Sequence, residues 1–424
     1  MKFLRTLLLA VPLAGAVRLD RQGKVSYDGY KIFRVAPEFA DAVEAELGDL
    51  SGMHLMRTAQ HFDVAIPPES IESFQLLNVS SELISDDIGA DIALEGELAP
   101  YESPVQALDV AAAAAVPDPS WFRAYHSYND HLTFLSDLQK AFPSNSEIFR
   151  AGTSFEGRAI TGIHLWGSGG KGSKPAITFH GTVHAREWIT TMVNEYIAWQ
   201  LVVGYSNDTT VKAYLDSYDF YILPVVNPDG FVYTQTTNRL WRKNRQTRSG
   251  ISAVGTDVNR NWPYQWSGPG SSTSPSSETY RGQSGGDTPE NLGLRTHVDN
   301  VARAQGLKLY IDWHSYSQLI LLPYGYSCSA RAENIDEQMT LARGVASAIA
   351  RPYGTRFDYG PTCSTIYQTN GGSNDYIQDV SGAEFAWAFE LRDTGRNGFV
   401  LPPEQIIPSG FEAWEGVKNL LNNF

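Results

Sequence analysis

From Trp121 to the C-terminus, short apolar stretches alternate with longer stretches in which apolar residues recur every three or four positions. The first pattern is typical of buried strands and the second of amphipathic helices. A chain that alternates them predicts an α/β fold, with a mixed central sheet flanked by helices and ligands at the strand ends. We predict strands at residues 161–166, 176–180, 220–226, 308–312 and 385–389, and helices at 128–142, 187–203, 336–350 and 411–421.

The N-terminal part predicts a second, smaller unit, because 424 residues exceed the usual size of one domain. Its pattern favours a small α+β unit. Prolines 117 and 119 follow an alanine run at 111–115 and disfavour a continuous helix, so we predict an accessible boundary there, between domains 17–117 and 118–424. The predicted strands cover 24–35, 61–66 and 82–84, and the predicted helices cover 38–50 and 69–77.

The first sixteen residues have the pattern of a secretory signal peptide. Lys2 and Arg5 precede the apolar run 7–13, and Ala14-Gly15-Ala16 supplies small residues suited to signal peptidase. The run is too short to span a bilayer, and nothing later resembles a membrane span. We expect a secreted, extracellular, soluble protein; the alternative is a buried N-terminal strand or helix.

The net charge of −14 is concentrated in the N-terminal part. Residues 17–117 contain 6 Lys and Arg against 18 Asp and Glu, a net −12. Phosphate binding needs a basic surface, so we expect no nucleic-acid partner. The alternative interpretation of this acidic segment is a solvated surface.

Cysteine and asparagine patterns fit the oxidising secretory route. Cys328 and Cys363 are the two cysteines and could form one disulfide or remain two buried thiols, since sequence does not fix their distance. Asn78 and Asn207 each begin an Asn-x-Ser/Thr tripeptide and are possible glycosylation sites.

His184 and Glu187 stand between a predicted strand and a predicted helix, three residues apart. An imidazole and a carboxylate on the opening turn of a helix can converge on one point, and zinc accepts both ligands. His314, just past the predicted strand 308–312, is the natural third ligand and leaves a fourth position for water, as in catalytic zinc sites. The alternative is a polar helix start. The other histidines, among them His164 and His180 inside strands, lack this placement.

Other polar residues leave alternatives open. Glu390 follows the apolar strand 385–389 and is either salt-bridged to a neighbour such as Arg392 or kept for acid–base chemistry. Arg239, Arg242 and the Asn259-Arg260 pair offer planar donors for a carboxylate or an oxyanion, or are surface charges.

The motifs together resemble the pancreatic-type zinc carboxypeptidases of the carboxypeptidase A/B family, in family order from about Trp121 to the C-terminus. They are His-Ala-Arg-Glu-Trp-Ile at 184–189, Asn-Pro-Asp-Gly-Phe at 227–231, Asn-Arg-Leu-Trp-Arg-Lys at 238–243, Asp-Val-Asn-Arg-Asn-Trp at 257–262, His-Ser-Tyr-Ser-Gln at 314–318, Ile-Tyr-Gln at 366–368 and Phe-Glu-Leu-Arg-Asp-Thr-Gly-Arg at 389–396. The acidic N-terminal unit is similar to the family's activation domain, an open sandwich that covers the active site in the zymogen.

The resemblance implies a role for each matching residue and one Zn²⁺ per catalytic domain. His184, Glu187 and His314 would be the zinc ligands, Asp257 would orient His184, and Glu390 would be the general base and acid. Arg242 would polarise the scissile carbonyl. Asn259 and Arg260 would hold the terminal carboxylate of a peptide, Tyr367 would close over it, and Arg186, Arg239, Ser315 and Tyr316 would line its path.

The resemblance also implies a monomeric zymogen, with residues 17–117 as an intramolecular inhibitor that an activating protease removes. Asn374 matches the floor of the specificity pocket, where the family has an aliphatic residue for apolar substrates or Asp for basic ones. We therefore expect A-type cleavage after apolar residues; broader or B-like specificity and a non-catalytic peptide-binding protein are the alternatives. Other pocket positions match Leu321, Gly325, Thr362, Ile366, Thr369 and Ala388.

The chain departs from the vertebrate enzymes in its cysteines. Ala253 and Ser276 fill the positions of a cysteine pair common in those enzymes. Cys328 and Cys363 resemble a second pair that some relatives have.

Overall fold

The computed structural model of the protein describes residues 18–20, 23–104 and 116–424. By packing, the chain divides into two compact units, Met1–Ala90 and Asp91–Phe424. The predicted signal peptide and the alanine run at 111–115 lie outside the described residues. The packing boundary near residue 90 precedes the processing boundary predicted near residue 117, which stays a prediction.

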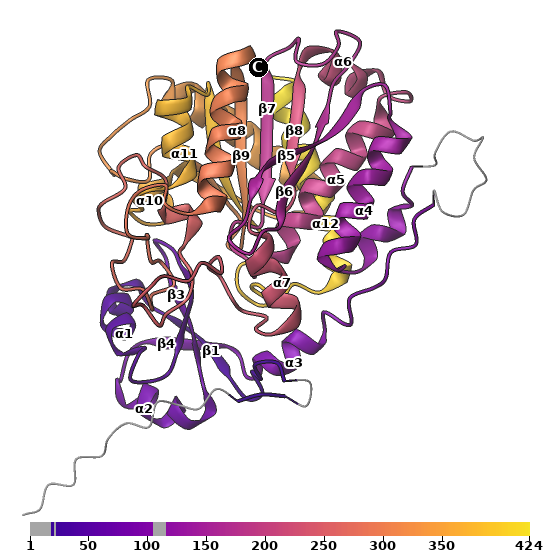
Figure 1. The fold of residues 1–424 in the computed structure, drawn as a ribbon. Coiled ribbons are helices and arrows are strands. Elements are labelled where there is room, and N and C mark those ends of the chain that lie inside the picture. Colours follow the sequence, from indigo (N-terminus) through magenta and orange to yellow (C-terminus); the bar gives the residue numbers. More distant parts are fainter. Residues whose placement is uncertain (1–17, 21–22, 105–115) are drawn as a thin grey trace, which may run out of the picture. The chain divides into compact units, whose positions relative to one another are not determined.

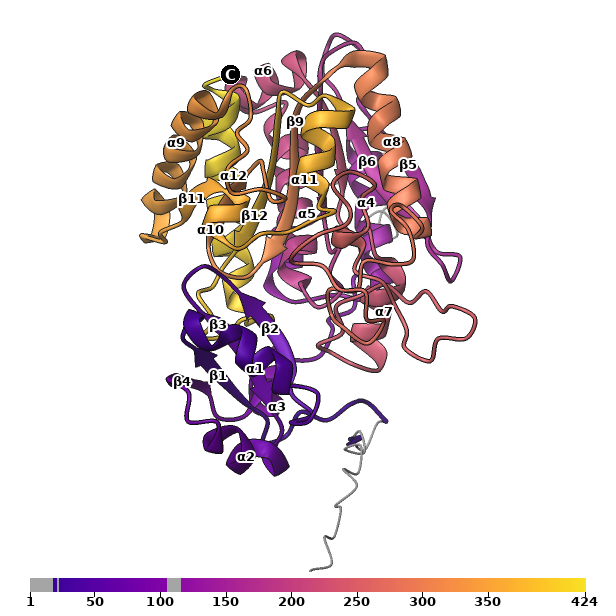
Figure 2. The same ribbon diagram turned by 90° about the vertical axis from the view of Figure 1, so that its left-hand side faces the viewer.

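The smaller unit contains a four-stranded antiparallel sheet in the order β2-β3-β1-β4 (Figures 1 and 2). Alternate side chains of its strands meet two short helices, and Val35, Val43, Phe62 and Phe74 lie in the resulting core. The elements are β1 (Lys31–Val35), α1 (Ala40–Glu46), β2 (Met53–Arg57), β3 (Phe62–Ile66), α2 (Ile71–Leu76) and β4 (Ser81–Ser85); α3 (Ile88–Ala93) spans the division.

The larger unit is built on an eight-stranded sheet in the order β11-β10-β12-β9-β7-β8-β6-β5. The central strands β12, β9, β7 and β8 are parallel, and helices cover both faces (Figures 1 and 2). The strands are β5 (Ser146–Thr153), β6 (Ala159–Leu165), β7 (Ala176–Gly181), β8 (Asp219–Leu223), β9 (Leu307–Ser315), β10 (Leu319–Leu322), β11 (Asp358–Pro361) and β12 (Phe385–Leu391).

The helices of the larger unit pack against two separate cores. Ile177, Ile311 and Trp313 point into one core, together with residues of the adjacent helices α9 and α12 (Figure 2). Ala176 and Tyr310 point into the other, beside α8. The helices are α4 (Tyr128–Ala141), α5 (Trp188–Gly204), α6 (Thr209–Ser217), α7 (Pro228–Thr236), α8 (Pro289–Gln305), α9 (Ile335–Tyr353), α10 (Thr362–Thr365), α11 (Ser373–Tyr376) and α12 (Ile406–Leu421).

The predicted α/β class is confirmed, with three local corrections at the chemistry-bearing residues. His314 and Glu390 lie inside β9 and β12 rather than beyond them, because both strands continue into polar residues. Helix α5 begins at Trp188, so Glu187 is its N-cap and His184 lies in the preceding loop.

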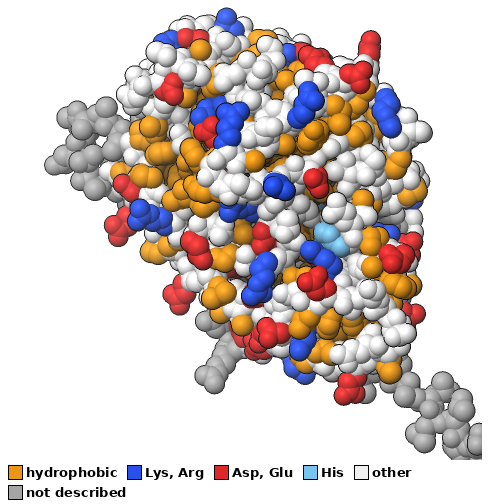
Figure 3. All heavy atoms as spheres, turned by 180° about the vertical axis from the view of Figure 1, so that it is seen from behind, with side chains coloured by type: hydrophobic (Ala, Val, Ile, Leu, Met, Phe, Trp, Pro, Cys, Tyr) orange, Lys and Arg blue, Asp and Glu red, His pale blue; other side chains and the backbone are white. Residues whose placement is uncertain are grey.

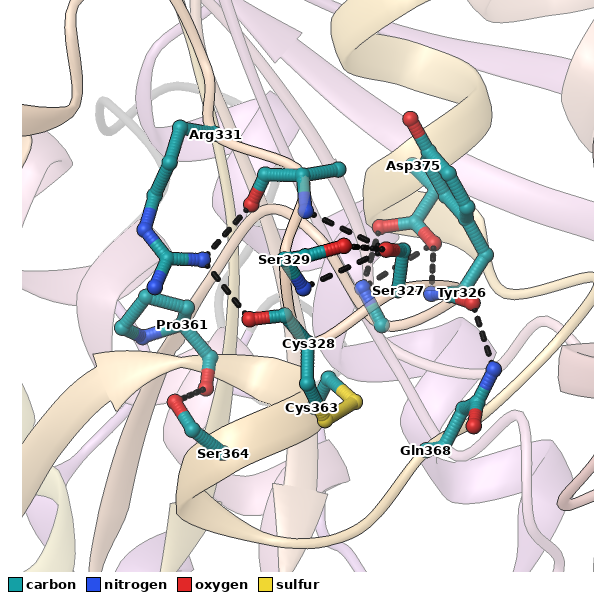
Figure 4. The surroundings of a disulfide bond; sticks show 12 residues. Tyr326, Ser327, Cys328, Ser329, Arg331, Pro361, Cys363, Ser364, Gln368 and Asp375 are labelled. Carbon is teal, nitrogen blue, oxygen red and sulfur yellow. Dashed lines mark hydrogen bonds between the residues drawn. A yellow bond between two sulfur atoms is a disulfide. The ribbon is translucent and has the colours of Figure 1, made fainter.

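Cys328 and Cys363 form a disulfide with a Cα–Cα distance of 4.9 Å, so the alternative of two buried thiols is wrong. The bond ties the loop after β10 to α10, as Figure 4 shows. The same loop is held by Asp375, which accepts hydrogen bonds from the backbone N–H groups of Gly325 and Tyr326 (Figure 4). The disulfide therefore fixes the loop that carries Gly325.

Several surface features bear on the other predictions. Asn78 and Asn207 are exposed, as glycosylation acceptors need to be. On the face drawn in Figure 3, basic side chains are interspersed with acidic ones. Among the described residues, no helix combines the length and apolar character needed to cross a membrane.

Replacing both cysteines by serine should lower the free energy of unfolding. The disulfide spans 35 residues of sequence, and closing a loop of that length constrains the unfolded chain by about 3–4 kcal/mol. Denaturant unfolding of the double variant, compared with the wild type in its oxidised form, measures this loss. An unchanged unfolding midpoint would contradict it.

Candidate metal centre and active site

His184, Glu187 and His314 converge within the larger unit. One ligand atom from each lies within 4.8 Å of the others, and all three side chains are buried. Nδ1 of His184 lies 2.8 Å from Glu187 Oε1 and 3.1 Å from Nδ1 of His314. Nδ1 of His314 lies 3.1 Å from Glu187 Oε2. Two imidazole nitrogens and one carboxylate fit zinc and leave a coordination position open.

Parallel strand pairing brings these ligands together. Strands β7 and β9 are neighbours in parallel register, so their carboxyl ends meet at one edge of the sheet. His314 lies near that end of β9, and the chain leaving β7 supplies His184 and then Glu187 at the start of α5. Burial alone would raise the pKa of Glu187, but the adjacent His184 and His314 lower it to about 2. Glu187 is therefore a carboxylate, the form that binds a cation.

Asp257 lies behind the first ligand. Its Oδ1 atom is 3.1 Å from Nε2 of His184, the nitrogen remote from the cluster. Arg242 donates from Nη2 to Asp257 Oδ2 at 2.9 Å, which compensates the charge of this buried carboxylate. A carboxylate on the far nitrogen fixes the tautomer and orientation of a ligand histidine, as the resemblance implied for Asp257.

Glu390 lies beside the second ligand, because β12 pairs with β9 in a register that places Glu390 opposite His314. Burial raises the pKa of Glu390 to about 8. Its Oε2 atom is buried without a hydrogen-bond partner among the described residues. Arg392 instead donates from Nε to Glu412 at 2.8 Å, so the alternative of a Glu390–Arg392 salt bridge is wrong. A carboxyl group with this environment is suited to proton transfer.

Arg260 and Asn259 extend from the same short helix near the cluster. Arg260 donates from Nη2 to the Tyr367 hydroxyl at 2.7 Å. The Asn259 side chain accepts from the Ser373 backbone N–H at 2.9 Å, and its amide nitrogen lies 3.2 Å from Nε2 of His314. These planar donors are thus assembled next to the predicted ligand set.

Residues predicted for the specificity pocket lie next to one another in pairs. Asn374 donates from Nδ2 to the Thr362 hydroxyl at 3.1 Å. Leu321 and Ala388 are partners in the β10–β12 pairing. A Cβ atom on Gly325 would approach the Thr369 hydroxyl to 2.3 Å, so glycine is required there for space.

The structure shows the surroundings of Arg186, Arg239, Ser315 and Tyr316, and two of their neighbours, Phe399 and Glu95, were not predicted from the sequence. The Arg186 guanidinium lies 4.2 Å from the Phe399 ring centroid, and the Tyr316 ring lies 4.9 Å from that of Phe399. The Ser315 backbone N–H donates to Glu187 at 3.4 Å. Arg239 stacks on Trp188 at 3.8 Å and is paired with Glu95. No local pattern marks Phe399 or Glu95, since each is remote in sequence from its partner.

Residues 131–416 match the zinc carboxypeptidase family. The chain belongs to that family. It is 46% identical over 422 residues to a metallocarboxypeptidase A-like protein of Trichophyton verrucosum, covering 98% of this chain and 97% of the relative. It is 39% identical over 302 residues to carboxypeptidase A2 of Rattus norvegicus, covering 71% and 70%. The crystal structure of the carboxypeptidase A from Helicoverpa armigera superposes with a TM-score of 0.78 at 28% identity, covering 94% and 98%.

The family confirms the predicted reaction class and cofactor. The protein is a zinc metallocarboxypeptidase, an exopeptidase that acts on the C-termini of peptides. The family's metal matches the His184–Glu187–His314 donor set.

Proposed function

We propose that this metallocarboxypeptidase is made as a secreted zymogen and releases single, preferentially apolar residues from peptide C-termini. The observation that supports the catalytic assignment is the Glu390 oxygen beside the His184–Glu187–His314 cluster, which is buried and has no hydrogen-bond partner in the part of the chain that the structure describes. Secretion is inferred from the N-terminal sequence pattern. The exposed Asn78 and Asn207 would then be open to glycosylation.

In this proposal the substrate is held at its terminal carboxylate. Asn259 and Arg260 donate to that carboxylate, and the Tyr367 hydroxyl closes over it from its present contact with Arg260. The Arg242 guanidinium donates hydrogen bonds to the oxygen of the scissile carbonyl and stabilises the negative charge that develops on it. Asp257 holds the Arg242 guanidinium in place for this role.

In this proposal Glu390 is the group that transfers the protons of the reaction. His184, Glu187 and His314 would hold the zinc ion, which would supply Lewis-acid chemistry for the scissile carbonyl and the attacking water. Glu390 accepts a proton from the attacking water and donates it to the nitrogen of the leaving residue. Its buried position lets one group act first as base and then as acid, because little solvent competes for the proton.

Replacing Glu390 by Gln should lower kcat by at least about 100-fold, the usual contribution of a general acid–base group. The amide keeps the shape but cannot accept the proton, so zinc content should remain that of the wild type. A steady-state assay on a peptide with a free C-terminus, with zinc quantified in the same samples, measures both.

The matched control is Glu384→Gln, which changes a surface carboxylate paired with Lys308 just before β12. It should leave turnover unchanged. Turnover of Glu390→Gln within tenfold of wild type would refute the assignment. A wild-type protein without chelator-sensitive turnover would support the non-catalytic binding alternative.

Latency is supported by a contact between Glu95, which belongs to the predicted pro-segment, and Arg239; both residues lie within the larger unit. Glu95 accepts from Arg239 Nε at 2.6 Å and from Nη2 at 2.5 Å, and both side chains are buried. Such bidentate pairs are strong and directional. Arg239 is proposed to line the substrate path, so Glu95 would keep it from substrate until residues 17–117 are cut and released.

The segment around Glu95 has further contacts that would hold it in place. Tyr101 packs edge-on against Trp121 at 4.8 Å and donates to Asp137. The Ala99 backbone N–H donates to the Tyr125 carbonyl at 2.9 Å. Removal of the pro-segment would have to break these contacts together with the ion pair.

Replacing Glu95 by Gln should raise the peptidase activity of the uncut precursor and leave the processed enzyme unchanged. Breaking one partner of a buried ion pair costs about 3–5 kcal/mol, which weakens the blocked state. Activity before and after processing, with intact mass to confirm each form, measures the effect. The exposed Glu97→Gln is the control, and a fully active uncut wild type would contradict latency.

A-type preference is supported by the neutral floor of the pocket. Asn374 donates to the Thr362 hydroxyl and accepts from the Asp375 backbone N–H, each at 3.1 Å, so both ends of its neutral amide have a hydrogen-bond partner. A Lys or Arg head buried against it would lose hydration without a compensating charge, at a cost of several kcal/mol. We expect Phe, Tyr, Leu and Met to be preferred, with some tolerance of polar residues.

Replacing Asn374 by Asp should shift the preference towards Lys and Arg, because the new carboxylate compensates the buried cation. We expect kcat/KM for a C-terminal Lys, relative to Phe, to rise at least about tenfold, equivalent to roughly 1.4 kcal/mol of differential binding. Competing peptides that differ only in the last residue measure it. Asn374→Leu is the control and should keep basic residues disfavoured. A wild-type preference for Lys or Arg over Phe and Leu would overturn the A-type proposal.

A further inference from the structure

We propose that Asp312 is a positioning residue for the metal ligand His314, and that His180 and Tyr310 hold its carboxylate in place. The inference rests on the proposed role of His314 as a ligand. It adds a second carboxylate–histidine pair to the one that Asp257 forms with His184.

Strand geometry puts these groups together. Side chains two residues apart on a strand share a face, so Tyr310, Asp312 and His314 all lie on one face of β9. His180 is the direct partner of Asp312 in the parallel β7–β9 pairing. All four side chains are buried.

The contacts fix which nitrogen of His314 carries a proton. Its Nδ1 atom faces Glu187 and His184, so it is the metal-binding nitrogen and Nε2 is protonated. Asp312 Oδ2 lies 3.0 Å from Nε2. The Asn259 amide nitrogen lies 3.2 Å away but is itself a donor, because the Asn259 oxygen accepts from Ser373. Of these two neighbours, only the Asp312 carboxylate can accept the proton.

Asp312 has polar neighbours on two sides. The Ser373 hydroxyl donates to Oδ2 at 2.6 Å. His180 Nδ1 lies 3.3 Å from Oδ1, within ion-pair distance, although neither atom has a hydrogen bond of regular geometry among the described residues. Burial lowers the pKa of His180 to about 4, so this imidazole is neutral with one proton. Burial raises the pKa of Tyr310 well above its usual value, so its hydroxyl stays protonated, and it is hydrogen-bonded to His180 Nε2. In the proposed arrangement the hydroxyl is the donor of this hydrogen bond, and the single His180 proton lies on Nδ1, towards Asp312.

The charge of Asp312 gives a second reason to link it to the metal. Among the described residues, its ion-pair neighbours are His180 and His314, with no Lys or Arg. Asp257, in contrast, has Arg242 at 2.9 Å. A buried carboxylate without a cation is costly, and a divalent ion on His314 would supply the missing positive charge. Asp312 and the metal should therefore stabilise each other.

Asp312→Asn tests this by zinc affinity and thermal stability. We expect zinc binding, measured by competition with a chromogenic chelator, to weaken about 10–100-fold. The zinc-induced rise in Tm should shrink, while the Tm of the zinc-free protein stays equal or increases. A merely structural role would lower both Tm values equally and leave zinc affinity unchanged, and that result would overturn the inference.

Two carboxylate variants serve as matched controls. Asp219 lies 2.6 Å from the buried His164, away from the ligand cluster, so Asp219→Asn should leave zinc affinity unchanged. Asp257→Asn should weaken zinc binding, since it removes the other carboxylate–histidine pair.

The variant His314→Ala separates the ligand assignment from the present inference. If His314→Ala binds zinc as tightly as the wild type, the proposed ligand assignment fails. If His314→Ala loses zinc but Asp312→Asn does not, the present inference alone fails.

His180 provides an independent pair of variants. His180→Asn can place an amide N–H near the position of Nδ1, whereas His180→Leu offers Asp312 no donor. We expect zinc affinity to fall further in His180→Leu than in His180→Asn. If both His180 variants bind zinc as tightly as the wild type, His180 does not help to hold Asp312 in place.

Discussion

The parallel pairing of β9 with β7 and β12 is the constraint on which the catalytic site depends. It places Glu390 opposite His314 and His180 opposite Asp312, and it brings the loop that carries His184 and Glu187 to the same edge. Backbone hydrogen bonds fix these registers to a single residue, because a slip by one would turn each side chain to the other face. The positions of His314, Glu390, Asp312 and His180 relative to one another therefore follow from the register of the sheet.

Burial then determines what each charged group can do. Glu187 is kept ionised by two histidines, whereas burial raises the pKa of Glu390. Asp257 has an arginine to balance its charge, whereas the partners of Asp312 in the described part of the chain are imidazoles and a hydroxyl. Four carboxyl groups within one buried region thus have four electrostatic environments. The roles proposed for them, as ligand, proton carrier and positioning groups, follow from their partners rather than from their residue type.

Most of the fold followed from periodicity, and the failures have identifiable causes. Strands β7 and β12 were predicted because uninterrupted apolar runs indicate strands buried on both faces. Strand β2 was missed because His54 and Arg57 break its alternation. The end of β9 was placed too early, since Asp312, His314 and Ser315 are polar residues inside a buried sheet. Helix α8 was not predicted, although Thr288-Pro289 is a typical sequence for the start of a helix.

The sequence by itself determined the family, the α/β class and the residue types that can bind zinc, and it named the glutamate for which we propose the proton-transfer role. These are fixed by local patterns and short motifs, which act over a few residues. Tertiary structure decided that Arg392 pairs with Glu412, that Glu95 meets Arg239, and that Asp312 faces His314 and His180. Most of these contacts join residues far apart in the chain, and all depend on strand order, register and the packing of loops at the sheet edge, which short-range patterns do not encode.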